Sequence, residues 1–194
     1  MIVEGKQKIW ADYQKDIPDD HYFYVRSCIR QSFFPGSEVT FLDITRNKLN
    51  KDFYESAYHT TCGGIAYHSD SIPQETAMTI IARQFALMHE CGYENYVCSC
   101  ITSFGCYTET LETWHEFPEL EAKIRQYLWD SCKKEFAKPK YLAHASDIIY
   151  KFRHEIAKQA KYKLVNAKTG KPLKVVEHIG CHYSKMFPSK GFGG

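Results

Sequence analysis

The sequence lacks several patterns that would assign it at once to a large class of proteins. It has no run of about eighteen consecutive apolar residues, the length that a membrane-spanning helix needs. Residues 1–20 are too polar for a secretory signal, and no basic tract interleaved with aromatic side chains indicates nucleic-acid binding. We therefore expect a cytoplasmic protein with no membrane span and no nucleic-acid partner.

An excess of charge of one sign is also lacking. The chain has 25 Lys and Arg against 23 Asp and Glu, well mixed along its length, for a formal charge of +2. Its 194 residues, 44% of them hydrophobic, suffice for one globular domain of ordinary size plus part of another.

Strand-like and helix-like segments alternate along the chain, which predicts an α/β fold with a largely parallel sheet flanked by helices. Runs rich in aromatic and β-branched residues predict strands at residues 21–28, 54–61, 95–100, 141–143 and 173–180. Helices are expected at residues 36–48, 73–92, 109–116, 118–134 and 147–160. The predicted domains are an N-terminal extension (1–20), a first cysteine-rich domain (21–172) and the incomplete start of a second, similar domain (173–194).

A short phrase that begins with cysteine occurs twice. Cys28 is followed by a Phe-Pro pair, and Cys181 is followed by a Phe-Pro pair at the same spacing. Each copy follows a strand-like run, so the repeat predicts two similar domains that each open a cysteine site at the end of their first strand.

Eight cysteines are present, and five of them fall in segments that we expect to converge. Sites in parallel sheets gather at the carboxyl ends of strands, where the sequence places Cys28, Cys62, Cys98, Cys100 and Cys106. Thiolates are soft ligands that suit iron–sulfur clusters or zinc. Zinc favours Cys-x-x-Cys pairs, which this chain lacks, so an iron–sulfur cluster is the first prediction and zinc the weaker alternative. Cys91 and Cys132 lie in helical patterns and are expected to be buried side chains rather than ligands.

Cys28, the phrase Cys62-Gly63-Gly64 and a cysteine-rich loop that ends in Cys106 follow one another in an order that resembles the B subunit of heterodisulfide reductase, a protein with cysteine-rich CCG domains. The phrases that carry this resemblance are residues 34–38, 62–68, 99–105 and 178–183. The resemblance covers roughly residues 22–194, and duplication of the domain is a trait of the family.

The resemblance implies a set of metal ligands. In that family each complete domain carries one Cys, a Cys-Cys pair and a Cys-x-x-Cys, and the two sets hold two noncubane [4Fe-4S] clusters. By position, Cys28, Cys62 and Cys100 match the first ligand, the first member of the pair and the first member of the final pair. Cys181 matches the first ligand of the second domain.

Two positions depart from the family pattern. Gly63 stands where the second cysteine of the pair is expected, and Ser103 stands where the closing cysteine is expected. Cys98 and Cys106 are the candidates to replace them. Without such replacement three thiolates remain, which implies either a conventional cluster with a substitute ligand or no cluster.

The resemblance also implies an oxidoreductase subunit that takes part in electron transfer and methanogenesis. Such a subunit reduces the disulfide of coenzyme M and coenzyme B, or a related acceptor, with electrons from iron–sulfur and flavin partner subunits. Cys181 and His182 are the candidate catalytic residues, with His182 available to protonate a departing thiolate. We expect the chain to be inactive alone. Two alternatives stay open: a non-catalytic assembly module with a degenerate first cluster site, and a zinc-stabilised structural domain.

Overall fold

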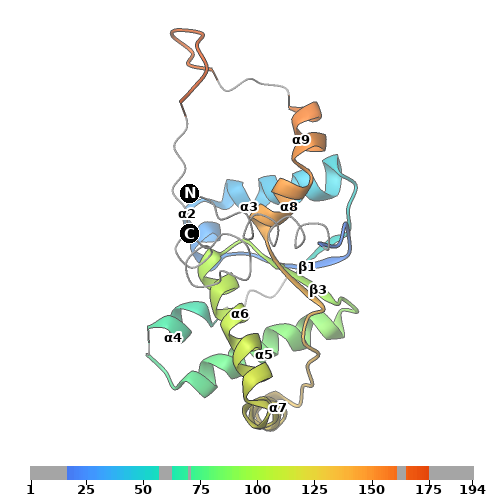
Figure 1. Cartoon of the computed structure of the whole chain (residues 1–194), viewed down its shortest axis with the longest axis vertical. Helices are drawn as coiled ribbons and strands as arrows, with labels where there is room; N and C mark the ends of the chain where they lie inside the picture. The colour runs from blue at the N-terminus through green and yellow to red at the C-terminus, as the bar shows by residue number, and fades with distance from the viewer. Residues whose placement is uncertain (1–16, 57–62, 70, 161–164, 175–194) are drawn as a thin grey trace, which may run out of the picture.

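The computed structural model of the chain describes residues 17–56, 63–69, 71–160 and 165–174 (Figure 1). In these residues a sheet of parallel strands has the order β2-β1-β3-β4. The strands are β1 (Tyr22–Val25), β2 (Phe53–Glu55), β3 (Asn95–Cys98) and β4 (Tyr141–His144). The predicted α/β fold with a parallel sheet is confirmed.

The helices of the described residues connect and cover these strands. They are α2 (Cys28–Phe33), α3 (Pro35–Leu42), the π-helical turn η1 (Asp43–Lys48), α4 (Gly64–His68), α5 (Gln74–Glu90), α6 (Ile101–Glu116), α7 (Pro118–Cys132), α8 (Ala145–Lys151) and α9 (Arg153–Gln159).

Every residue of β1 is buried, as expected for a parallel strand that is covered on both faces. Alternate side chains enter different cores. Phe23 and Val25 join one hydrophobic cluster, and Tyr22 and Tyr24 join the other. The first cluster packs against α5, α6 and α7, and the second against α3 and α8, so the sheet lies between two helical layers (Figure 1).

The order of the strands creates a switch point between β1 and β3. From β1 the chain moves outward to β2, then returns to place β3 and β4 on the other side of β1. Because all strands are parallel, their carboxyl ends meet at one edge, and at the switch point the connections leave that edge in opposite directions. This edge is therefore where a binding site is expected.

Helix α6 begins eight residues earlier than the sequence pattern indicates, at Ile101 rather than at Glu109. Its first two turns contain Thr102, Ser103 and Gly105, which are weak helix formers, and this concealed the start. Burial compensates for low propensity, since most residues from 103 to 108 are inaccessible to solvent.

Other boundaries also differ from prediction. Strand β1 ends at Val25, so Cys28 begins helix α2 instead of closing the strand. The helix predicted over residues 147–160 is divided into α8 and α9 at Phe152, whose ring packs in the second cluster. The predicted strand at 173–180 lies mostly outside the described residues.

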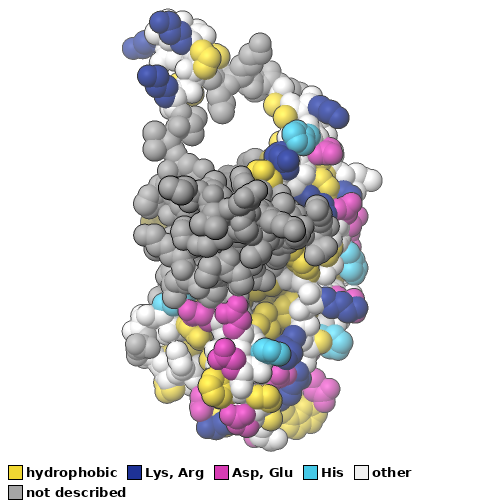
Figure 2. All heavy atoms as spheres, in the orientation of Figure 1, with side chains coloured by type: hydrophobic (Ala, Val, Ile, Leu, Met, Phe, Trp, Pro, Cys, Tyr) yellow, Lys and Arg dark blue, Asp and Glu magenta, His cyan; other side chains and the backbone are white. Residues whose placement is uncertain are grey.

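Among the described residues, acidic and basic side chains are interspersed along the lower and right-hand parts of the face shown in Figure 2, in keeping with the balanced composition. Within the described part of the chain, no helix is both long and apolar enough to cross a membrane.

Candidate functional site

Cys28 and Cys100 follow neighbouring strands at the carboxyl edge of the sheet. Cys28 is exposed at the start of α2, and Cys100 is half-buried at the N-cap of α6. The register of β1 and β3 pairs Val25 with Cys98, so both thiol-bearing loops leave the sheet at the same level.

A hydrogen bond joins these two loops directly. The backbone N–H of Ser27 donates to Ser99 Oγ at 2.9 Å, and the backbone N–H of Ser99 donates to the carbonyl oxygen of Val25 at 3.4 Å. Ser27 immediately precedes Cys28, and Ser99 immediately precedes Cys100. The structure therefore brings the two predicted site residues onto adjacent, mutually bonded loops.

A carboxylate that the sequence did not single out lies beneath the same loops. Glu38 of α3 is 0% exposed. Ser99 Oγ lies 2.8 Å and 3.0 Å from its two carboxylate oxygens, and the Tyr24 hydroxyl donates to one of them. Glu38 is the only charged residue of α3, but nothing in the local sequence marks its burial.

Cys98, the last residue of β3, and Cys106 of α6 have their side chains buried in the first hydrophobic cluster, with exposures of 1% and 0%. The Cys98 thiol contacts the carbonyl oxygens of Cys100 and Ala143 at 3.8 and 3.9 Å. The Cys106 thiol donates to the carbonyl oxygen of Ser103 at 3.2 Å. Both thiols therefore lie in the core, whereas Cys28 is exposed and Cys100 is half-buried.

Gly63 occupies a backbone position that favours glycine. Its φ is +77°, and a Cβ there would lie 3.2 Å from Ile81 Cγ1 and 3.3 Å from the carbonyl oxygen of Ala77 in α5. A cysteine at this position would meet both the backbone restriction and the wall of α5. The second cysteine of the family's Cys-Cys pair therefore does not fit at this position without strain.

Gly64 brings the start of α4 against α6. A Cβ at Gly64 would lie 3.4 Å from the backbone of Ser103 and 3.4 Å from Cys106 Sγ. Ser103 itself is 3% exposed. Burial of Tyr67 of α4, together with the nearby Glu109, raises the pKa of its hydroxyl group to about 12. The segment after Cys62 thus packs onto α6 three residues beyond Cys100.

Several predicted site residues lie outside the described part of the chain, namely Cys62, Cys181 and His182. Among the residues that the structure does describe, no three His, Cys, Asp or Glu side chains form a group that could hold a metal ion. Cys28 and Cys100 lie on adjacent loops at the carboxyl edge, one exposed and the other half-buried. The family's full set of thiolates does not fit, because glycine and serine stand at two of its positions and Cys98 and Cys106 face the core.

The prediction for two other cysteines is corrected by the structure. Cys91 is exposed at the C-cap of α5, and Cys132 is only partly buried, with its thiol donating to the carbonyl oxygen of Leu128 at 3.3 Å. Cys91 follows the last turn of its helix, where the apolar stripe has already ended, so helical periodicity overstated its burial.

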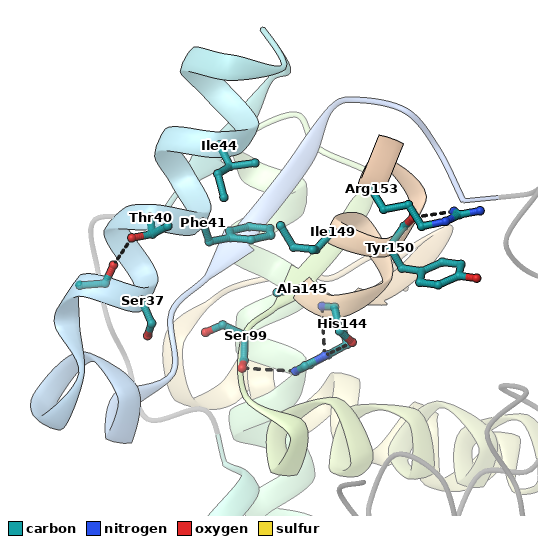
Figure 3. Close-up of a pocket in the computed structure, with 12 residues that line it drawn as sticks. Ser37, Thr40, Phe41, Ile44, Ser99, His144, Ala145, Ile149, Tyr150 and Arg153 are labelled. Carbon is teal, nitrogen blue, oxygen red and sulfur yellow. Dashed lines mark hydrogen bonds between the residues drawn. The ribbon is translucent and has the colours of Figure 1, made fainter. Parts of the chain in front are cut away.

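A mainly apolar crevice of about 670 Å³ opens between α3 and α8 beside this edge (Figure 3). Its walls include Phe41, Ile44 and Ile149, and its polar lining includes Ser99 and His144. Volume and composition lie in the range of small-molecule sites.

His144 is held in one tautomer at the crevice wall. Its Nδ1 accepts from the backbone N–H of Ser146 at 3.2 Å, and its Nε2 lies 3.3 Å from the carbonyl oxygen of Ser99 (Figure 3). A backbone N–H can only donate, so Nδ1 is the acceptor and Nε2 carries the proton. His144 therefore presents a fixed N–H to the loop that carries Cys100.

Comparison with known proteins finds a distant relative. No family model matches the chain. The chain is 25% identical over 179 residues to the B subunit of the ferredoxin:CoB-CoM heterodisulfide reductase of Methanosarcina acetivorans. The match covers 89% of this chain and 55% of the relative, so the chain spans about half the length of the protein it matches. The resemblance to the B subunit of heterodisulfide reductase that the cysteine motifs indicate is thereby confirmed.

Proposed function

We propose that this chain is a redox subunit of a heterodisulfide-reductase-type complex. Within such a complex it takes electrons from iron–sulfur and flavin partners and delivers them to the coenzyme M–coenzyme B disulfide or a related acceptor. The observation that carries the proposal is the juxtaposition of Cys28 and Cys100 at the switch point, in a chain that is similar to a heterodisulfide reductase protein over 89% of its length.

The first metal centre that we propose uses three thiolates, from Cys28, Cys62 and Cys100. An iron–sulfur cluster, when bound there, supplies one-electron chemistry. The packing around Gly63 and the burial of Cys98 and Cys106 argue against the five-thiolate arrangement of the family. We assign the second site to Cys181, with His182 as the proton donor to a product thiolate.

The residues beside the first site have roles that do not depend on the number of iron atoms. Ser99 and Glu38 fix the Cys100 loop, and the crevice between α3 and α8 offers an apolar surface for an organic acceptor. At the wall of this crevice, the Nε2–H of His144 donates to the carbonyl oxygen of Ser99 and orients that group.

A second candidate function is a non-catalytic assembly module whose first site no longer binds a cluster. The close approach of Gly64 to Ser103 and Cys106 favours it, because α4 and α6 are packed together where the family has ligands. Metal analysis distinguishes the two functions.

Protein prepared without oxygen should contain about four iron atoms per chain if one cluster binds. Cys28→Ala, Cys62→Ala and Cys100→Ala should each lower the iron content. Cys132→Ala is the matched control, since that partly buried thiol lies on α7 and should leave the iron content unchanged. Folded but iron-free protein would support the assembly module, and stoichiometric zinc without iron would support a zinc-stabilised structural domain.

A further inference from the structure

We propose that Glu38 and Ser99 form a clamp that positions the Cys28 and Cys100 thiols beside each other at the switch point. Both are positioning residues, because they act on the thiols through the two loops and not on a substrate. This inference rests on the proposed role of Cys28 and Cys100 in the redox site, and it names the side chains that set the geometry of that site.

Ser99 is the centre of the clamp because each of its polar groups is used. Its hydroxyl oxygen accepts from the N–H of Ser27, and the hydroxyl lies within hydrogen-bond distance of both Glu38 oxygens. Its backbone N–H donates to Val25, and its carbonyl oxygen accepts from His144 Nε2. The serine between two cysteines is thereby tied to β1, α3 and β4 at once.

Glu38 gives the clamp its rigidity. A carboxylate that is 0% exposed has lost its hydration, so it depends on the hydroxyls of Ser99 and Tyr24. Motion of the Ser99 loop away from Glu38 would take a donor from the buried carboxylate, and this cost holds the loop in place.

The clamp matters for the proposed site because Ser99 and Ser27, whose N–H donates to Ser99 Oγ, each lie next to one of the two cysteines. Ser27 precedes Cys28, and Ser99 precedes Cys100. Ligand constellations need side chains held within about 0.5 Å of their working geometry, usually by buried hydrogen bonds behind the ligands. Neither Cys28 nor Cys100 is buried enough to be fixed by packing alone.

The test measures the alkylation rate of each cysteine by iodoacetamide in reduced, metal-free protein, with mass spectrometry to assign the modified residue. Ser99→Ala removes the central hydroxyl, and Glu38→Leu removes its acceptor. Glu38→Gln is the conservative variant, because its amide oxygen still accepts from Ser99. Thr108→Val is the matched control, since Thr108 is a buried residue of α6 whose hydroxyl donates to the carbonyl oxygen of Phe104 at 2.9 Å, away from the clamp.

Ser99→Ala and Glu38→Leu should raise the alkylation rate of Cys100 about fivefold, the factor that one buried hydrogen bond contributes to a local opening equilibrium. Glu38→Gln should restore most of the protection, and Thr108→Val should leave the rate unchanged. Cys106 serves as the internal reference in every variant, because it is 0% exposed on the same helix and reports opening of α6 as a whole.

An unchanged Cys100 rate in Ser99→Ala, or an equal rise at Cys100 and Cys106, would overturn the clamp. If Ser99→Ala does not fold, the alkylation rates of Cys100 and Cys106 in the two Glu38 variants test the clamp instead. The iron content of the wild type tests the proposed function separately. Iron-free wild-type protein would contradict the metal centre, while the alkylation rates would still show whether the clamp exists.

Discussion

The two edges of the sheet are each tied together by an acidic side chain, yet they are built differently. At the carboxyl edge, Glu38 is fully buried and joins α3 to the loops after β1 and β3. At the amino edge, Asp52 is half exposed. It lies 2.9 Å from His21 Nδ1 and accepts from the Tyr93 hydroxyl at 3.0 Å, and the rings of those two residues stack at 4.3 Å.

The difference indicates which edge is structural and which is suited to chemistry. The amino-edge cluster faces water, so solvent can replace each of its bonds at little cost. The carboxyl edge holds a carboxylate in the interior next to two cysteines and a crevice, where polar groups are expensive to bury. Fold stability alone does not require such an arrangement, since apolar residues would serve a purely structural junction as well.

Removing the two carboxylates should expose this contrast most strongly. Glu38→Ala leaves the buried hydroxyls of Ser99 and Tyr24 without this acceptor and opens a cavity, so we expect a loss of about 3 kcal/mol in the free energy of unfolding. Asp52→Ala removes only exposed bonds and should cost at most about 1 kcal/mol. Urea unfolding of both variants provides the measurement, and equal losses would mean that the two edges do not differ in kind.

Much of the scaffold behind this contrast could be predicted from sequence. Alternating apolar segments indicated the parallel sheet, and helix α5 followed from a regular apolar stripe between Pro73 and Gly92. Strand ends located Cys28 and Cys100 on the same edge. These features depend on local pattern and on the geometry common to all parallel sheets, which is why one sequence sufficed.

The parts that escaped prediction depend on contacts between distant segments. Glu38 meets Ser99, which is 61 residues away, and no local pattern marks a buried carboxylate. Cys106 was assigned to a loop because weak helix formers hid the start of α6. Once that helix begins at Ile101, Cys106 faces the core. The restriction at Gly63 arises from the side of α5, which the sequence near Cys62 does not reveal.

Two glycines with nearly the same positive φ sharpen the comparison at a smaller scale. Gly63 at the carboxyl edge has φ +77°. Gly92 at the amino edge has φ +79°, and a Cβ added to it would meet no atom of the described residues within 4 Å. Gly92→Ala should therefore cost about 1 kcal/mol from the backbone alone. Gly63→Ala should cost about 2 kcal/mol, because contacts with Ile81 and the Ala77 carbonyl are added.

The two unfolding free energies give the packing cost at Gly63 as their difference. A difference near zero would show that α5 yields to a side chain there. In that case Gly63→Cys becomes a practical way to restore the family's cysteine pair, and its iron content should then be compared with that of the wild type.

The smallest expected effect concerns the pH dependence of the amino edge. Burial, followed by the hydrogen bond to Asp52, raises the pKa of Tyr93 to about 12 from its ordinary value of 10.0. A phenol whose pKa is higher in the folded state stabilises the fold below its ordinary pKa, and this contribution disappears as the pH rises through the folded value. Tyr93→Phe should therefore lower stability by only a few tenths of a kcal/mol at neutral pH, since Tyr93 is only partly buried and Asp52 is half exposed, and the gap to wild type should close between about pH 10 and 12. Urea midpoints measured across that range test the expectation.

In an Asp52→Ala background the Tyr93→Phe substitution should show a weaker dependence on pH, because one of the causes of the raised pKa is absent. A gap that is the same at every pH in both backgrounds would contradict the raised pKa of Tyr93 and leave the stacking on His21 as its main contribution to this edge.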